Sequence, residues 1–183
     1  MNKKKNNGID NSKSTIWKTN EKNILPLVLA KKLMDSAERD NLLPSEIFGP
    51  AKISISGIKD DWTNFKFDNK HYLEPSKIKK IRIHNNDFNI IKDSLRFFNE
   101  FYSYIPLIET DDISDWPYLF AAQLQVLAEQ ISLSPLEALM LFGVIYEGNF
   151  EDYWEELNWK YLITRKFTNV ALMQHEHLKH KNH

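Results

Sequence analysis

The chain of 183 residues contains no cysteine, which excludes disulfide bonds, thiolate nucleophiles and cysteine-ligated zinc sites. This absence suits a reducing compartment, and we predict a cytoplasmic protein. Long apolar runs are also absent. The stretch "ILPLVLA" at residues 24–30 falls far short of the roughly 20 residues that a transmembrane helix needs. No cleavage site of small residues follows it, so we expect neither a signal peptide nor a membrane partner.

Glycine and histidine are scarce where catalysis would need them. The five glycines, at positions 8, 49, 57, 143 and 148, form no glycine-rich phosphate loop, and no serine lies in a Gly-x-Ser-x-Gly turn. No histidine occurs between residues 85 and 174, which excludes an acid–base histidine from that part of the chain. These absences predict a protein that is not an enzyme and holds no cofactor.

Positive charge is missing from a long central span. From Phe97 to Trp159 there is no lysine, arginine or histidine, while acidic residues give the span a formal charge of −12. The net charge of the chain is only −1, because residues 160–183 carry +4 and the first 96 residues carry +7. Such asymmetry indicates the kind of partner rather than the fold. The acidic residues are Glu100, Glu109, Asp111, Asp112, Asp115, Glu129, Glu137, Glu147, Glu151, Asp152, Glu155 and Glu156.

Composition divides the chain into one domain with two tails. Residues 1–22 are polar and rich in asparagine and lysine, and we predict a disordered basic tail. Residues 23–174 have the apolar periodicity of a globular domain, in line with the 42% hydrophobic content of the chain. Within this domain we expect a helix and a small sheet over residues 23–84 and a helical bundle over residues 85–174. Residues 175–183 form a histidine-rich C-terminal tail.

The predicted fold class is α+β and mostly α. Leucines one turn apart predict an N-terminal helix from Ile24 to about Arg39. Three short stretches then alternate apolar and polar residues, which is typical of strands. We expect them to form a three-stranded antiparallel sheet with one apolar and one basic face. The alternating apolar pairs are Ile53 and Ile55, Phe65 and Phe67, and Ile81 and Ile83.

A bundle of four to five helices is expected to follow this sheet. Apolar residues recur there at the spacing of a helix face, and proline or glycine interrupts the pattern between the stripes. The predicted helices cover residues 91–102, 120–131, 134–148 and 150–161, and a shorter one covers 170–180.

The stretch "LQVLAEQISLSPLEALMLFG", from Leu124 to Gly143, resembles a helix-turn-helix in its spacing. Ser132 lies where such turns commonly have glycine. Ser134 and Glu137 form a capping box that starts the second helix, with Pro135 at the first helical position. The resemblance covers about twenty residues.

The chemistry of this stretch does not suit the reading of DNA. A recognition helix presents Arg, Lys, Asn or Gln to the base edges, whereas this one offers Glu137, Ala138 and Met140 within an acidic span. A winged helix would also require a hairpin soon afterwards, and we expect the sequence to continue as helix. We therefore interpret the two helices as part of the core.

The alternative hypothesis is a nucleic-acid-associated regulator, which would use the helix-turn-helix-like unit and a basic patch. The stretch "EPSKIKKIRIHNN" brings Lys77, Lys79, Lys80 and Arg82 close together on and before a predicted strand. A basic sheet can bind backbone phosphates and stacked bases. The simpler interpretation is that these residues solvate the outer face of a small sheet and discourage edge pairing.

Two clusters have the residue types of a metal site. On a helix, Glu151 and Asp152 would lie one turn from Glu155 and Glu156, but the histidine companions of di-metal bundles are missing. We interpret these carboxylates as a solvated acidic face. The C-terminal histidines could capture Zn²⁺ or Ni²⁺ adventitiously, and we predict no functional metal site. These histidines are His175, His177, His180 and His183.

The main hypothesis is a non-catalytic protein-binding module with an acidic, aromatic helical surface and a basic partner. The partner is either a toxin, which this chain would neutralise as an immunity protein or antitoxin, or a subunit of a larger complex that it would serve as adaptor. The predicted partner-binding residues are Asp111, Asp112, Asp115, Trp116, Glu151, Asp152, Trp154, Glu155 and Glu156. Aromatic residues expected to protrude are Tyr102, Tyr104, Trp116, Tyr118, Tyr146, Tyr153, Trp154 and Trp159.

Overall fold

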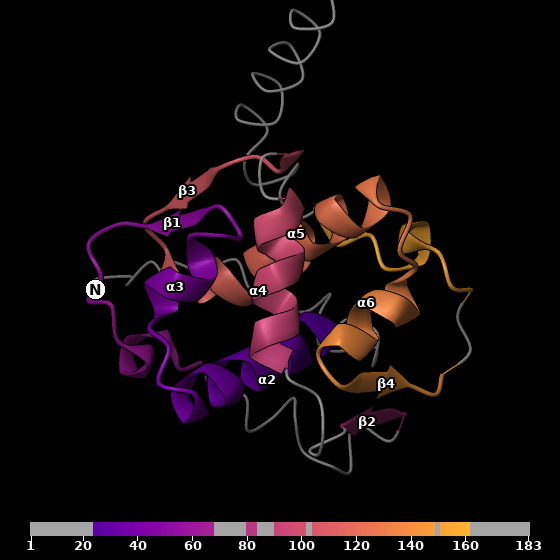
Figure 1. Ribbon diagram of the computed structural model, residues 1–183, viewed down its shortest axis with the longest axis horizontal. Coiled ribbons are helices and arrows are strands. Elements are labelled where there is room, and N and C mark those ends of the chain that lie inside the picture. Colours follow the sequence, from indigo (N-terminus) through magenta and orange to yellow (C-terminus); the bar gives the residue numbers. More distant parts are fainter. Residues whose placement is uncertain (1–23, 68–79, 84–89, 102–103, 149–150, 162–183) are drawn as a thin grey trace, which may run out of the picture.

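The computed structural model describes residues 24–67, 80–83, 90–101, 104–148 and 151–161, and every structural statement below concerns these residues (Figure 1). They form a mixed and mostly helical fold, as predicted. The α-helices are α2 (Leu25–Arg39), α3 (Pro44–Phe48), α4 (Ile90–Phe101), α5 (Trp116–Gln130) and α6 (Pro135–Leu141). The strands are β1 (Ile53–Ile55), β2 (Ile81–Ile83), β3 (Ile108–Thr110) and β4 (Val144–Tyr146), and the 3₁₀-helices are η2 (Trp62–Phe65), η4 (Ile113–Asp115) and η5 (Trp154–Glu156).

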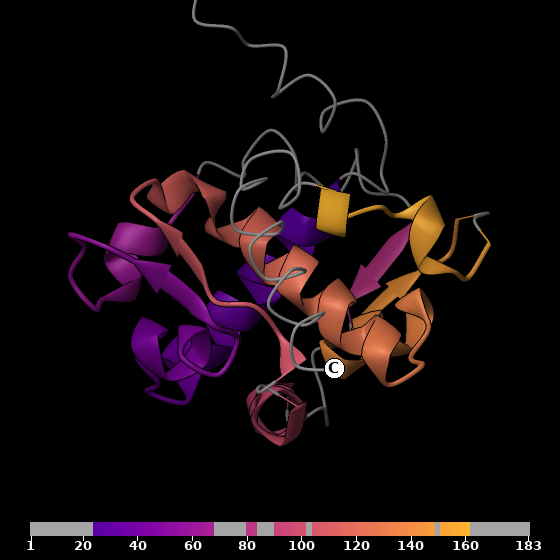
Figure 2. The ribbon, with the colours of Figure 1, turned by 90° about the horizontal axis from the view of Figure 1, so that it is seen from above.

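Helices α2 and α5 form the centre of the core, and α4 packs against α2. Leu25, Leu29 and Leu33 lie one turn apart on α2 and are fully buried, which confirms the predicted stripe. Helix α5 is buried over most of its length and crosses the middle of the molecule (Figure 2). Each fully buried leucine contributes about 1.5–3 kcal/mol relative to an exposed one, so this helix pair supplies much of the stability.

A cluster of aromatic rings fills the side of the molecule that carries α3 and β1. The rings of Phe48, Trp62, Phe65 and Trp116 contact one another with centroids 5.2–6.4 Å apart, mostly edge to face. The Trp62 indole donates to the Leu42 carbonyl at 2.7 Å. Burial of large rings with a satisfied indole N–H is the most favourable use of tryptophan in a core.

The predicted three-stranded antiparallel sheet is not formed. The strands pair as two separate two-stranded sheets. Strand β1 pairs in parallel with β3, with Ile53 opposite Ile108. Strand β2 pairs antiparallel with β4, with Ile81 opposite Tyr146. Each sheet therefore joins a strand from the first part of the chain to one that follows α4, a pairing that alternation within a segment cannot reveal.

The expected middle strand is instead a short 3₁₀-helix. The Asp61 carboxylate accepts a hydrogen bond from the Thr63 amide at 2.9 Å and so starts η2. Both of its bulky residues, Trp62 and Phe65, are buried in the aromatic cluster. The apolar alternation of Phe65 and Phe67 thus reflects packing against Trp116 rather than a pleated strand.

Helices α2 and α5 end in the same way. Asn41 and Ser132 adopt left-handed conformations, with φ of 57° and 59°. The next amide then bonds back across the last turn, from Leu42 to the Ala37 carbonyl at 2.8 Å and from Leu133 to the Ala128 carbonyl at 2.9 Å. These are Schellman motifs, which satisfy carbonyls that a helix end would leave unpaired. The tight turn expected at Ser132 is therefore present.

One predicted helix is shorter than expected, and another is not formed. Helix α6 ends at Leu141, and Gly143 has a φ of 64°, which turns the chain into β4 rather than on to residue 148 as helix. The expectation that helix continues beyond the helix-turn-helix-like unit is therefore wrong. Residues 151–161 do not form the predicted fourth helix either. They contain the short 3₁₀-helix η5, and α-helical backbone begins only at Lys160.

Candidate functional site

The segment after β4 is fastened across the turn between α5 and α6. The Asp152 carboxylate accepts a hydrogen bond from the Leu136 amide at 2.9 Å. The Trp154 indole donates to the Leu133 carbonyl at 2.7 Å, and the Lys160 amide donates to the Gln125 side chain at 2.7 Å. The ring of Trp154 also packs against the fully buried Trp159, with centroids 5.5 Å apart. These contacts hold the backbone of residues 152–160 in place.

Acidic side chains project from this anchored segment. Glu151, Glu155 and Glu156 are exposed, while Trp154 between them points into the core with 5% of its surface exposed. The inward groups fix the backbone from which these carboxylates project, and Glu151 and Glu156 also interact with Tyr153. A fixed array of charge loses less conformational entropy on binding than a mobile one.

Tyr153 lies among these carboxylates and is 42% exposed. Its hydroxyl donates to the Glu156 carboxylate at 3.3 Å. A hydrogen bond with Glu151, burial and the negative charge of Glu151 and Glu156 raise the Tyr153 pKa from 10.0 to about 12. The phenol therefore stays protonated and offers its ring edge and hydroxyl at the surface.

The outer face of α6 adjoins this segment. Glu137 is exposed and completes the predicted capping box, since the Ser134 amide donates to its carboxylate at 2.8 Å and its own amide donates to the Ser134 hydroxyl at 3.3 Å. Met140 is 48% exposed, and the half-buried Leu136 lies one turn before it. We call the combined region the α6 acidic surface. Its members are Leu136, Glu137, Met140, Glu151, Asp152, Tyr153, Glu155 and Glu156.

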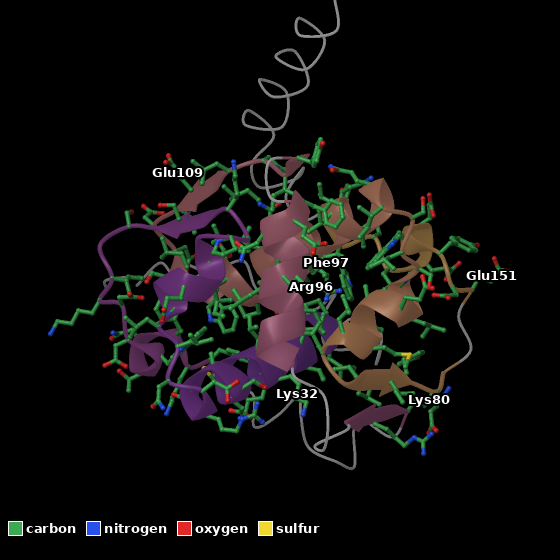
Figure 3. All side chains as sticks on the ribbon, viewed as in Figure 1. Lys32, Lys80, Arg96, Phe97, Glu109 and Glu151 are labelled. Atoms are coloured by element: carbon green, nitrogen blue, oxygen red, sulfur yellow. The ribbon has the colours of Figure 1, made fainter. Side chains whose placement is uncertain are left out.

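The predicted partner-binding residues fall into two groups that the structure does not bring together. Figure 3 shows Glu109, which begins the acidic run of residues 109–115, on one side of the molecule and Glu151 on the other. Asp111 is exposed, and Asp112 accepts hydrogen bonds from the Ser114 amide and hydroxyl at 3.0 and 2.6 Å, which caps η4. Asp115 is half-buried at the start of α5. One continuous acidic surface is therefore not formed.

Both predicted partner-binding tryptophans are core residues. Trp116 is 1% exposed and donates its indole N–H to the Phe65 carbonyl at 2.8 Å, and Trp154 is buried as described above. The expectation that they protrude is wrong, because each indole finds both an aromatic environment and a backbone acceptor inside the fold. Of the other aromatics expected to protrude, Tyr104 and Tyr153 are exposed, Tyr118 is half-buried, and Tyr146 and Trp159 are buried. Tyr102 lies outside the described residues.

Some of the acidic residues are neutralised within the fold. Glu100 lies 3.6 Å from the Arg96 guanidinium, Glu129 lies 2.6 Å from the Lys160 ammonium, and Glu147 lies 2.5 Å from the Arg82 guanidinium. All three ion pairs are at least partly exposed to solvent, and none of them includes a member of the α6 acidic surface. Basic residues from outside the central span therefore offset the negative charge of Glu100, Glu129 and Glu147.

The predicted basic patch is described only in part. Arg82 is ion-paired with Glu147, and the Lys80 carbonyl accepts the Glu147 amide at 2.7 Å. The Arg82 side chain is therefore paired with the acidic residue that follows β4. Lys77 and Lys79 lie outside the described residues.

The first turn of α6 offers no amide to a phosphate group. Pro135 has no N–H, the Leu136 amide donates to Asp152, and the Glu137 amide donates to Ser134. The exposed side chains of this helix are Glu137 and Met140. A recognition helix needs amides and basic or amide side chains facing the nucleic acid, and this helix has neither there.

Comparison with known proteins gives no further indication of the function. No family model, curated protein or solved structure matches the chain. Within the described ranges, no three His, Asp or Glu side chains converge as metal ligands, and the C-terminal histidines lie outside those ranges. No helix of the described part is long and apolar enough to span a bilayer.

Proposed function

We propose that this chain is a non-catalytic protein-binding module that presents the α6 acidic surface to a positively charged partner protein. The proposal depends on one observation. An exposed tyrosine, Tyr153, stands among carboxylates on a segment that Asp152, Trp154 and Lys160 anchor to α5 and α6. Tyrosine and methionine are enriched at interfaces, and complementary charge accelerates association and excludes wrong partners.

The chemistry of the surface favours a partner groove lined with lysine and arginine. Such a groove normally holds the phosphates of a nucleic acid, and the carboxylates of Glu151 and Glu155 would occupy phosphate positions. Two partner classes fit equally. One is a nucleic-acid-cleaving toxin, which this chain would neutralise as an immunity protein or antitoxin. The other is a basic subunit of a larger complex, with this chain as adaptor. A cytoplasmic location is part of the same proposal.

Two features of α6 weigh against the alternative of a nucleic-acid-associated regulator. The amides of its first turn are occupied by the protein's own Asp152 and Ser134. The neighbouring surface is acidic, so each phosphate contact would meet a like charge instead of releasing counterions to a lysine. The same features favour a protein that competes with nucleic acid for a basic groove.

The test is affinity capture from the native host with two matched charge reversals. Wild-type protein is expected to recover a partner with a basic surface. Glu155→Lys, within the α6 acidic surface, is expected to slow association with that partner about tenfold at low salt. Glu38→Lys reverses an equally exposed carboxylate on α2 and should leave association unchanged. An association rate that Glu155→Lys leaves unchanged, or a duplex-DNA mobility shift that weakens with rising salt, would contradict the proposal.

A further inference from the structure

Strand β3 has an open hydrogen-bonding edge. It is paired only with β1 among the described residues, and Figure 1 shows it on the outer side of that strand. The Ile108 amide donates to the Lys52 carbonyl at 2.9 Å, and the Thr110 carbonyl accepts the Ser56 amide at 3.1 Å. Backbone groups of successive residues in a strand point to opposite edges. The amide and carbonyl groups of Leu107 and Glu109 are therefore directed away from β1.

Exposed apolar side chains border this edge. Leu107 is 46% exposed and Tyr104 is 67% exposed, whereas Ile108 is fully buried. Because side chains alternate along a strand, Leu107 and Glu109 share the solvent face. An exposed strand edge with an adjoining apolar side chain is a template for the addition of another strand, and proteins usually shield such edges.

We infer that the β3 edge binds an extended segment of a partner protein by strand addition, with an apolar residue beside Leu107 and a lysine or arginine beside Glu109. In this recognition mode, backbone hydrogen bonds give affinity and alternate side chains give specificity. Glu109 and Asp111 are both exposed along the same segment, and no basic residue occurs from Phe97 to Trp159. The charge of the edge thus selects a basic strand.

A second copy of this chain fits the edge less well than a basic strand. Pairing of two copies would bring the carboxylates of Glu109 and Asp111 from both chains into one small interface. Like charges across neighbouring strands destabilise the pair. The acidic edge therefore opposes self-association while remaining complementary to a basic segment.

This docking surface is separate from the α6 acidic surface. Glu109 and Glu151 lie on opposite sides of the molecule in Figure 3. Strand addition goes beyond the proposed function, and either surface can fail its test while the other passes.

A synthetic peptide tests strand addition directly. The probe is a capped octapeptide, Val-Thr-Lys-Thr-Val-Thr-Lys-Thr, which places valine and lysine two residues apart on one face of the added strand, and it is added to the full-length protein. Amide hydrogen exchange by NMR is expected to show new protection at Glu109 and Leu107. N-methylation of alternate peptide amides removes the backbone donors but keeps every charge, and it should raise the dissociation constant about tenfold or more. Replacement of the lysines by glutamate should have at least a similar effect, about tenfold.

Protein variants assign the binding to this edge. Glu109→Lys should weaken peptide binding about tenfold, since one attraction becomes a repulsion. Glu38→Lys, which reverses an exposed carboxylate on α2 outside both surfaces, should leave it unchanged. Asp111→Lys provides a second variant at the edge, and circular dichroism verifies the fold of each. Equal binding by the N-methylated peptide, protection confined to other residues, or no binding at millimolar peptide would each overturn the inference.

Discussion

At the scale of single residues, the same acidic side-chain type serves two purposes on the α6 acidic surface. Asp152 is exposed, but its carboxylate accepts the Leu136 amide and so contributes to the fold. Glu155 is exposed one residue after the buried Trp154. An N-terminal capping carboxylate contributes about 1 kcal/mol to a helix. Both were predicted to bind a partner; the hydrogen bond gives Asp152 a part in the fold, whereas a part for Glu155 in recognition belongs to the proposed function.

Tyr153 reports on the charge of this surface. Its pKa is raised to about 12 chiefly by the hydrogen bond with Glu151, so Glu151→Gln should lower that pKa toward its ordinary value of 10.0. The folded state holds the proton more tightly than the unfolded chain. The resulting contribution to stability is therefore complete below pH 10.0 and is lost as the pH rises through about 12. Ultraviolet titration of tyrosinate absorbance, with Glu38→Gln as control, measures the shift. An unchanged Tyr153 pKa in Glu151→Gln would contradict this assignment.

At the scale of secondary structure, the α5–α6 turn carries a local strain that can be relieved. Ser132 has a φ of 59°, a conformation that costs a residue with a Cβ atom about 1 kcal/mol more than glycine. Ser132→Gly should therefore raise the free energy of unfolding by roughly 0.5–1 kcal/mol, and Ser132→Val should lower it. Urea denaturation measures both. Asn41→Gly, at the matching position after α2, should give a smaller gain because asparagine tolerates this conformation. Equal stability of the glycine and valine variants at position 132 would refute the account.

Elements defined by local signals were predictable from the sequence, and those defined by distant partners were not. The leucine stripe of α2 and the capping box of Ser134 and Glu137 are contained within one or two turns, and both are confirmed. The run Val144–Tyr146 is apolar and follows a helix without a break in hydrophobicity, so it was predicted as helix. It is a strand because Gly143 turns the chain and because β2, which comes much earlier in the sequence, pairs with it.

The candidate site likewise combines one feature that the sequence predicts with others that depend on the folded structure. The acidic character of residues 151–156 follows from composition alone, and the structure leaves all four of these carboxylates exposed. Composition cannot reveal that Trp116 and Trp154 are buried, because a tryptophan suits a core and an interface equally well. Nor can it reveal that the acidic runs at 109–115 and 151–156 face different ways. For Met140 the sequence indicates only a side chain unsuited to reading DNA. Its neighbours in sequence are all apolar, so they do not show that it is exposed.

At the scale of the whole molecule, a central span of charge −12 that contains no lysine, arginine or histidine implies mutual repulsion that salt should relieve. Glu155→Lys removes one carboxylate from beside Glu151 and Glu156. It should therefore stabilise the fold at low ionic strength, by about 0.5 kcal/mol or less. Near 1 M NaCl, where the Debye length is about 3 Å, the gain should vanish. Thermal unfolding at both salt concentrations measures the difference, and Glu38→Lys, in a region of mixed charge that includes Asp35 and Arg39, should show no such salt-dependent gain.

This last comparison also bears on function. If the variant that impairs partner binding is the more stable one at low salt, the acidic cluster is retained at the expense of stability, as expected of a binding surface. If Glu155→Lys lowers stability equally at low and high salt, the carboxylate supports the fold instead. The electrostatic basis of the proposed interface would then be lost, while strand addition at β3 would stand on its own observations.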